Sequence, residues 1–234
     1  MLKKLFYNRK LVVSAFVVLI VLLTLVALVP VFYSVFLGSG VKTEPINKEK
    51  TKPASTALEG KWEVVTGNPF NHTGAGFTFY EILPGEKRFT SATTTAVSGQ
   101  ASVIGETLSE ATVTVDLTKL GSDSQVRDQN MKDKLFETHS FPEATFILTQ
   151  PVDLSALPAD GSTATIPVTG DLTIKGKTQA VEDELEFVRD GDTVLVGGDI
   201  AINRLDYDII TPDFIAAQIA EEGDINIRLT FAKA

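Results

Sequence analysis

The chain has 234 residues and a formal net charge of −9. Its first 40 residues carry four basic side chains and no acidic one, so residues 41–234 have a net charge of −13, which argues against binding to the phosphate backbone of a nucleic acid. The chain has no cysteine, which excludes disulfides, thiol chemistry, iron–sulfur ligation and an acylated cysteine anchor.

An apolar segment stands near the N-terminus. Between Leu11 and Val29 no residue is charged, and only Ser14 and Thr24 are polar. This length is close to the roughly 20 residues that cross a bilayer as a helix, whereas the apolar region of a cleaved signal peptide has about 7 to 15. The segment and the apolar residues after it predict a transmembrane helix over residues 11–37.

The basic residues before this helix predict its orientation. They lie within residues 1–10, and cationic flanks stay on the cytoplasmic side of a membrane. We therefore expect a single-pass protein of the cell membrane, with residues 1–10 in the cytoplasm and everything after Gly40 outside. The small residues Gly38-Ser39-Gly40 leave cleavage of the helix open as an alternative.

Residues 38–60 read GSGVKTEPINKEKTKPASTALEG and show no periodicity. They are rich in Lys, Thr, Pro and Glu, a composition that is typical of disordered chain. We expect a flexible tether between the helix and one folded domain over residues 61–234.

Strands dominate this domain. In residues 164–174 every even position is apolar or glycine and every odd position is polar or proline, which predicts a strand with one buried face and a bend at Gly170. The same alternation occurs in Thr112–Thr118 and Asp224–Thr230. Shorter β-like runs are Trp62–Thr66, Phe77–Leu83, Phe89–Ile104, Ala144–Val152, Val181–Val188 and Thr193–Ile202. At least eight strands joined by local turns favour an antiparallel barrel or a sandwich.

Two short helices interrupt the strands. One lies in GSDSQVRDQNMKDKLFETHSFPEATF, residues 121–146, and the other spans Pro212–Glu221. In the first, Ser122 and Gln125 fit a capping box. Helical spacing places Arg127 and Asp128 on either side of an apolar edge formed by Met131 and Leu135, and so turns these two charges towards the body of the domain.

Two interpretations of Arg127 and Asp128 remain open. In the first, they form an ion pair or hydrogen-bond strand ends, and so hold the helix on the barrel. In the second, they meet the polar head of a ligand at the mouth of the barrel. The first is favoured because edge ion pairs are common.

Catalytic and metal-binding motifs are not evident. His72 and His139 are the only histidines and stand far apart, outside any ligand spacing, so we expect no metal. No serine lies in a GxSxG context and no glycine-rich phosphate loop occurs, so we expect no cofactor and no enzyme activity.

The sequence resembles a known protein family. A run of motifs around the first helix, followed by Thr169–Gly176, is similar to the signature of the YceI-like family, and the resemblance extends in order from Trp62 to Phe231. The motifs are Thr114-Val115-Asp116-Leu117, Leu120-Gly121-Ser122-Asp123, Arg127-Asp128, Met131, Glu137-Thr138, Phe141-Pro142 and Ala144-Thr145-Phe146. The sequence departs at Ser91–Thr94, where similar anchored members tend to carry a Gly-Arg pair.

The resemblance implies a mainly β protein, a lipocalin-like antiparallel β-barrel with a helix packed against it. It also implies an apolar tunnel for a polyisoprenoid or another long amphiphile such as a fatty-acyl lipid, and no established catalytic residues. The residues that we expect to line the interior are Phe77, Phe79, Val97, Val113, Val115, Phe146, Val168, Leu172, Ile200 and Ile227.

Three functions compete on this basis. The leading hypothesis is a membrane-anchored extracytoplasmic barrel that carries or sequesters a lipid. The second is a structural or protein-interaction module with a filled core, because a barrel of about eight strands can also be filled by its own side chains. The third is an enzyme acting on quinones or prenyl phosphates, and only Arg127 and Asp128 support it.

Overall fold

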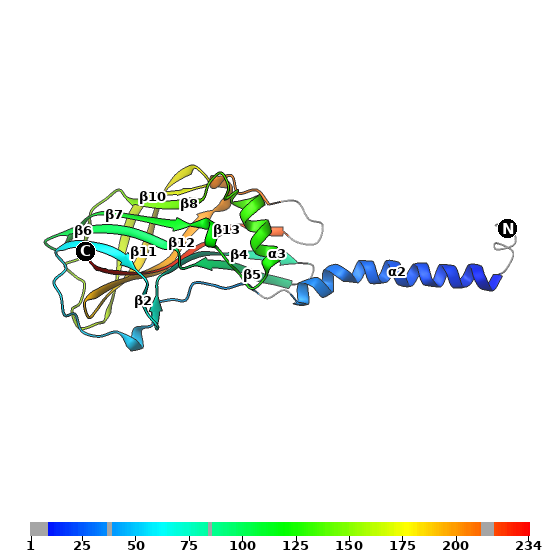
Figure 1. The fold of residues 1–234 in the computed structure, drawn as a ribbon, viewed down its shortest axis with the longest axis horizontal. Helices are drawn as coiled ribbons and strands as arrows, with labels where there is room; N and C mark the ends of the chain where they lie inside the picture. The colour runs from blue at the N-terminus through cyan, green and yellow to red at the C-terminus, as the bar shows by residue number, and fades with distance from the viewer. Residues whose placement is uncertain (1–8, 37–38, 84–85, 212–217) are drawn as a thin grey trace. The chain divides into compact units, whose positions relative to one another are not determined.

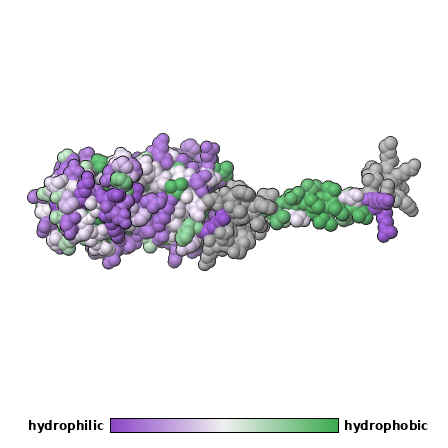
Figure 2. Space-filling model, turned by 90° about the horizontal axis from the view of Figure 1, so that it is seen from below, coloured by the Kyte–Doolittle hydropathy of each residue, from purple (hydrophilic) through white to green (hydrophobic). Residues whose placement is uncertain are grey.

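The computed structural model describes residues 9–36, 39–83, 86–211 and 218–234, which divide into two compact units, Met1–Gly38 and Ser39–Ala234. In the first unit the 28-residue helix α2 (Arg9–Phe36) is present where the sequence predicts a helix. Its described side chains from Val13 to Leu28 give it an apolar surface (Figure 2). Among the described residues, no helix reaches the combined length and hydropathy of a membrane-crossing segment.

The second unit is almost entirely antiparallel sheet (Figure 1). Its strands are β1 (Gly60–Val65), β2 (Gly67–Asn68), β3 (Asn71–His72), β4 (Gly74–Leu83), β5 (Glu86–Thr94), β6 (Val97–Ile104), β7 (Thr107–Asp116), β8 (Glu143–Leu148), β9 (Val152–Asp153), β10 (Thr163–Ile174), β11 (Lys177–Asp190), β12 (Thr193–Asn203) and β13 (Gln218–Lys233). Short helical turns are η1 (Lys48–Lys50), η2 (Leu117–Lys119), α3 (Gln125–Asn130), η3 (Met131–Leu135) and η4 (Arg204–Tyr207).

The sheet closes on itself. The order β1-β6-β7-β8-β10-β11-β12-β13 runs through eight strands of the described chain, and β1 pairs with both β6 and β13. Trp62 shows the closure, because it lies opposite Ala101 on one side and Lys233 on the other. β13 also pairs with β4, from Gln218 to Arg228, before it reaches its pairing with β1, and β4 forms a hairpin with β5. The structure is therefore a barrel and not a sandwich.

Alternation along the strands builds the core, as the sequence predicts. On β10 the side chains of Ile166, Val168, Leu172 and Ile174 are buried, whereas Pro167 is exposed. Successive side chains of a strand point to opposite faces, so one face of each strand lines the interior. Most buried apolar side chains of the described residues belong to this single cluster.

The first predicted helix is present, but its cap differs from the expectation. Ser124, and not Ser122, is the N-cap, and its hydroxyl accepts a hydrogen bond from the backbone N–H of Arg127. Ser122 lies before the helix and donates its hydroxyl to the carboxylate of Asp128 at 2.6 Å. The apolar edge is confirmed, since Met131 is buried beneath the helix.

The second predicted helix, Pro212–Glu221, is not confirmed. Residues 212–217 lie outside the described residues, and residues 218–221 belong to strand β13. Gln218 pairs with Ile82 and Ile219 with Glu81. A helix of this length is only marginally stable by itself. In the strand, the backbone of Gln218 and Ile219 is instead paired with β4.

The predicted disordered tether is instead an ordered segment, which we call the strap (Ser39–Glu59). It begins at β5, where the N–H of Val41 donates to the carbonyl of Ser91 at 3.2 Å. It ends near the β11–β12 turn, where Ser55 N–H donates to the carbonyl of Gly191 at 2.7 Å. The strap thus crosses the outer wall of the barrel, held by backbone hydrogen bonds that its composition does not reveal.

Ile46 fixes the middle of the strap. Its side chain is buried against Val188 and Leu195, which point outward from β11 and β12 and form a small cluster separate from the main core. We expect Ile46→Ala to lower the free energy of unfolding by roughly 2–4 kcal/mol, because the change removes buried methyl groups and leaves a cavity. Denaturant titration measures this loss, with the exposed Glu49→Ala as the matched control, and equal stability of both variants would show that the strap adds no packing energy.

The strap also covers a polar network on the outer wall. The Thr78 hydroxyl donates to the Asn226 amide oxygen at 2.6 Å, and the Asn226 amide donates to Asp199 at 2.7 Å. Lys42 of the strap forms an ion pair with Asp199 at 3.1 Å. Burial raises the pKa of the neighbouring Asp224, and the charge of Asp199 raises this pKa further.

A raised pKa makes Asp224 a source of pH dependence. Its folded pKa lies above the unfolded value, so its contribution to stability is greatest at low pH and is lost as the pH rises through the folded pKa. We expect Asp224→Asn to stabilise the protein at pH 7, and the gain to disappear below the ordinary carboxyl pKa of 3.8. Thermal unfolding across pH 3–7 measures this gain; Glu182→Gln, which removes an exposed carboxylate on β11, serves as the control, and a gain that does not change with pH would contradict the assignment.

Candidate functional site

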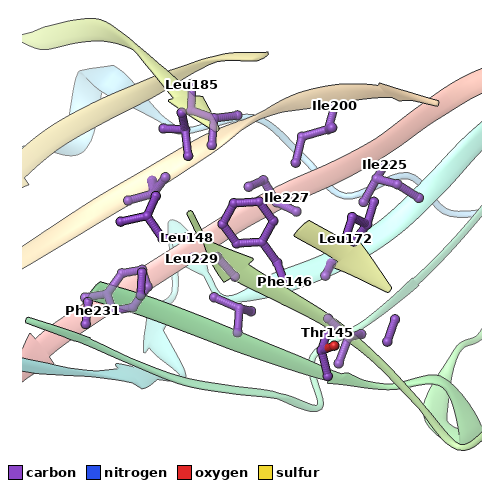
Figure 3. Close-up of a pocket in the computed structure, with 18 of the residues that line it drawn as sticks. Thr145, Phe146, Leu148, Leu172, Leu185, Ile200, Ile225, Ile227, Leu229 and Phe231 are labelled. Carbon is purple, nitrogen blue, oxygen red and sulfur yellow. The ribbon is translucent and has the colours of Figure 1, made fainter. Parts of the chain in front are cut away.

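The barrel encloses a cavity of about 150 Å³. Of the described residues that line it, all but Thr145 are apolar or glycine. Figure 3 shows the ring of Phe146 among Leu172 of β10 and Ile227 and Leu229 of β13. Such a cavity offers an apolar chain many dispersion contacts and almost no hydrogen bonds.

Glycine makes room for the central aromatic ring. A Cβ atom at Gly170 of β10 would lie 2.3 Å from the Cζ atom of Phe146, closer than real contacts allow. The sequence predicts a bend at Gly170, but β10 pairs with β11 through this position without a register shift. The space left by the glycine is instead occupied by the ring of Phe146 of the adjacent β8. A larger residue at position 170 would push the ring across the cavity.

Both ends of the cavity are lined by side chains that come from outside the main strands. At one end the side chain of Leu58, from the strap, lines the cavity. The carbonyl of Leu58 accepts a hydrogen bond from the Trp62 indole N–H at 2.8 Å. At the other end Phe136, which follows η3, packs against Phe77 with ring centroids 5.5 Å apart. The cavity therefore runs along the barrel between the strap end and the helix.

Eight of the ten residues that the sequence predicts for the interior line this cavity. They are Phe77, Val113, Val115, Phe146, Val168, Leu172, Ile200 and Ile227. Phe79 and Val97 do not line it. Phe79 is buried beside Phe77, with its ring over Gly223, and Val97 is half-buried at the start of β6.

The chain matches a family model for the YceI-like domain over residues 62–231. The chain belongs to the YceI-like family. Two solved structures share its fold. One, the structure of a polyisoprenoid binding domain from Saccharophagus degradans implicated in plant cell wall breakdown, has a TM-score of 0.57 and 20% identity, covering 74% of this chain and 98% of that one. The other, BcnA from Burkholderia cenocepacia, has a TM-score of 0.53 and 21% identity, covering 68% of this chain and 94% of that one. No curated protein matches the chain.

Arg127 and Asp128 of this YceI-like domain are engaged in the loop that precedes α3. The Arg127 guanidinium forms an ion pair with Asp123 and is mostly buried. The Asp128 carboxylate accepts hydrogen bonds from the backbone N–H of Ser122 at 2.7 Å and from its hydroxyl. Neither residue lines the cavity. Their observed contacts are therefore those of the first interpretation, an ion pair and hydrogen bonds that hold the helix, and not contacts with a ligand.

Sequence reasoning missed the groups that lie nearest to the cavity ends and one buried cation. Leu58 and Phe136 lie in irregular segments, where alternation gives no signal, whereas Trp62 is the buried residue of strand β1. Arg204 is buried at the start of η4, and its guanidinium donates to three backbone carbonyls. Burial lowers the pKa of Arg204, while the charge of Glu221 raises it.

The two histidines and the acidic side chains were the remaining candidates for a metal site. Both His72 and His139 are exposed. Over residues 9–36, 39–83, 86–211 and 218–234, no three acidic or histidine side chains gather in a group that could hold a metal ion. Burial raises the pKa of Tyr207 to about 12, which keeps its hydroxyl protonated.

Proposed function

We propose that this YceI-like barrel binds a long apolar chain, a polyisoprenoid or a fatty-acyl lipid, inside the cavity. The observation that carries the proposal is the lining, which is apolar around its whole circumference and runs from Leu58 to Phe136. Each buried CH₂ group contributes about 0.8 kcal/mol, so a chain of about ten carbons binds tightly without a charged partner. The polyisoprenoid binding domain from Saccharophagus degradans, which shares the fold, supports this choice of ligand class.

The location of the protein is a separate proposal that rests on the sequence. The uncharged stretch from Leu11 to Val29 and the basic residues before it support a single-pass anchor with the barrel outside the cytoplasm. An anchored barrel holds its lipid close to the membrane, as a carrier or as a sequestering protein. Protease protection of the two ends of the full chain in sealed membrane vesicles tests this arrangement.

The test of lipid binding uses the full chain purified in a mild detergent. We expect native mass spectrometry to show a bound species, and organic extraction to release an isoprenoid or fatty-acyl lipid. We also expect a prenol added to the delipidated protein to raise its unfolding temperature. A protein that carries no lipid and shows no response to prenols or fatty acids would falsify the proposal.

One observation favours the filled barrel as a second candidate. The cavity of about 150 Å³ is smaller than the roughly 300–1,000 Å³ of typical ligand pockets. A long chain therefore has to displace side chains such as Phe146, which stands among the lining residues (Figure 3). Binding of a short prenol but not of a long one would show that the ring does not move.

A further inference from the structure

The barrel wall is split over part of its length. Strands β11 and β12 pair with each other only between Glu186–Asp190 and Thr193–Gly197. Within the described chain, Lys177–Leu185 of β11 has no backbone partner on β12, and Gly198–Asn203 of β12 has none on β11. Both segments stay paired with their other neighbours, β10 and β13. We call these two facing segments the seam.

A carboxylate bridges the seam where a backbone ladder would otherwise run. Asp183 accepts a hydrogen bond from the N–H of Glu184 in its own strand at 2.9 Å, and another from the N–H of Ala201 in β12 at 3.0 Å. Asp183 is the register partner of Val168, which lines the cavity, so it occupies an inward-facing position of β11. A polar side chain therefore stands between the strands, two residues from the apolar inward position of Leu185.

Two exposed polar contacts join the remainder of β11 to η4 and the residue after it. The Gln179 amide donates to the carbonyl of Asp206 at 2.9 Å. Lys177 forms an ion pair with Asp208 at 2.9 Å, and the two side chains are 52% and 59% exposed. Water screens an ion pair this exposed, so it contributes little to holding the strands together. In the seam, side-chain contacts thus stand in for backbone hydrogen bonds.

The cavity reaches the seam from the inside. Leu185 and Ile200, one from each side of the seam, both line the cavity, and Figure 3 shows them on the same side of it. A Cβ atom at Gly198 would lie 2.8 Å from Cδ2 of Leu185, so the glycine leaves room for this leucine where the two strands part. Separation of the strands would therefore connect the outer surface directly with the apolar interior.

The strap holds β11 and β12 together where they are already paired. Ile46 is buried against Val188 of β11 and Leu195 of β12. Among the described residues, no hydrogen bond or ion pair joins the strap to Lys177–Leu185. This part of β11 can separate from β12 while the strap stays in place.

The two ends of the cavity are harder to open than the seam. Leu58 and Trp62 are buried at one end, and Phe136 is buried at the other. Opening an end moves such side chains into water and loses the free energy of their burial. Opening the seam breaks a few polar contacts, which hydrogen bonds to water can replace.

We propose that the seam is the portal through which the apolar chain of a lipid enters and leaves the cavity. The proposal rests on the lipid binding that we propose for this cavity. In the open state, Lys177–Leu185 moves away from β12 and η4, and the bridge from Asp183 to Ala201 is broken. The paired segment Glu186–Asp190 stays closed beneath the strap and serves as the hinge.

A reversible cross-link across the seam tests the portal, because the chain has no cysteine of its own. Glu182 and Ala201 are exposed residues on its two sides. Glu182→Cys and Ala201→Cys are combined in the full chain and joined by a short bismaleimide linker that contains a disulfide. Gln100→Cys with Thr112→Cys is the matched control, since these exposed residues are direct partners in the β6–β7 ladder. Stopped flow follows the release of a bound fluorescent prenol into excess detergent micelles, before and after the linker is reduced.

We expect the cross-linked seam to release the prenol at least ten-fold more slowly than the same protein after reduction, and the control to release it equally fast in both states. Equal rates before and after reduction of the seam variant overturn the portal but leave lipid binding intact. Equal slowing in the control also overturns the portal, because stiffening of the barrel anywhere would then suffice. An unaltered chain that binds no prenol overturns lipid binding and the portal together.

The bridging carboxylate provides a second test. Asp183→Ala removes the bridge and should release the prenol at least three-fold faster, with Kd changed less than two-fold because entry and exit use the same path. Asp183→Asn keeps an acceptor oxygen and should release the prenol at close to the original rate. Glu184→Ala, which removes an exposed neighbouring carboxylate, is the control. Chemical unfolding verifies that each barrel is intact, and an unchanged release rate in folded Asp183→Ala contradicts the proposal.

Discussion

Replacing Ala111 by phenylalanine is expected to weaken lipid binding by about 100-fold while the barrel remains folded. Ala111 on β7 and its register partner Ala101 on β6 both line the cavity. A phenyl ring at position 111 occupies the space of about four CH₂ groups of the ligand, at about 0.8 kcal/mol each, and so removes roughly 3 kcal/mol of binding free energy. Because the ring enters an existing cavity, its cost to folding should stay within the roughly 1–3 kcal/mol that is typical of overpacked cores.

The neighbouring residue provides a matched control. Thr112 is the next residue of β7 and points outward into solvent, so Thr112→Phe adds the same ring outside the barrel. Binding of a fluorescent prenol, followed by titration, should be lost in Ala111→Phe and retained in Thr112→Phe. If both variants bind as the unaltered chain does, the ligand does not occupy this cavity. Ala101→Phe repeats the experiment from the opposite strand, in case Ala111→Phe fails to fold.

Alternation allowed the faces of the strands to be predicted, but not the depth of each residue along the barrel. Val113 and Val115 were predicted from period two alone, and both line the cavity. Phe79 lies on the same face of β4 as Phe77, yet its ring lies over Gly223 and not in the cavity. The position of a residue along a closed barrel depends on register, and register is set by partners far away in sequence.

The strap illustrates a second limit. Its composition resembles that of a disordered linker, because Lys, Thr, Pro and Glu dominate it and no period is present. What orders it are contacts with distant strands, such as Ile46 with Val188 and Leu195, and single hydrogen bonds to turns. A segment that lies across strands presents no periodic face, so local sequence patterns carry no sign of its burial.

The residue pattern of 121–146 located the first helix, but the charged residues of this helix proved to act locally. Arg127 pairs with Asp123, and Asp128 holds the loop at Ser122, so both residues order the approach to α3. The buried cation that does link distant segments, Arg204, follows the end of β12 without any motif that marks it. From the sequence alone, a single arginine after a strand is expected at the surface. Only the folded structure shows that other segments of the chain bury Arg204.

Arg204→Ala is accordingly expected to lower the free energy of unfolding by about 3 kcal/mol. The guanidinium donates to the carbonyls of Ile209 at 2.6 Å, Ala220 at 3.0 Å and Ile219 at 3.2 Å, and so ties η4 to the start of β13. Alanine leaves these three acceptors without their donor, and each buried unpaired group costs about 1–3 kcal/mol, although local rearrangement and water recover part of this loss.

Tyr207, three residues further along η4, is the matched control for this experiment. It is as deeply buried as Arg204, but among the described residues its hydroxyl has no hydrogen-bond partner. Tyr207→Phe should therefore be neutral or slightly stabilising, because it removes an unsatisfied polar atom and keeps the ring. Arg204→Lys retains the charge but not the planar set of donors, so it should fall between the two. Denaturant unfolding ranks the three variants, and an Arg204→Ala protein as stable as Tyr207→Phe would show that the arginine does not hold η4 to β13.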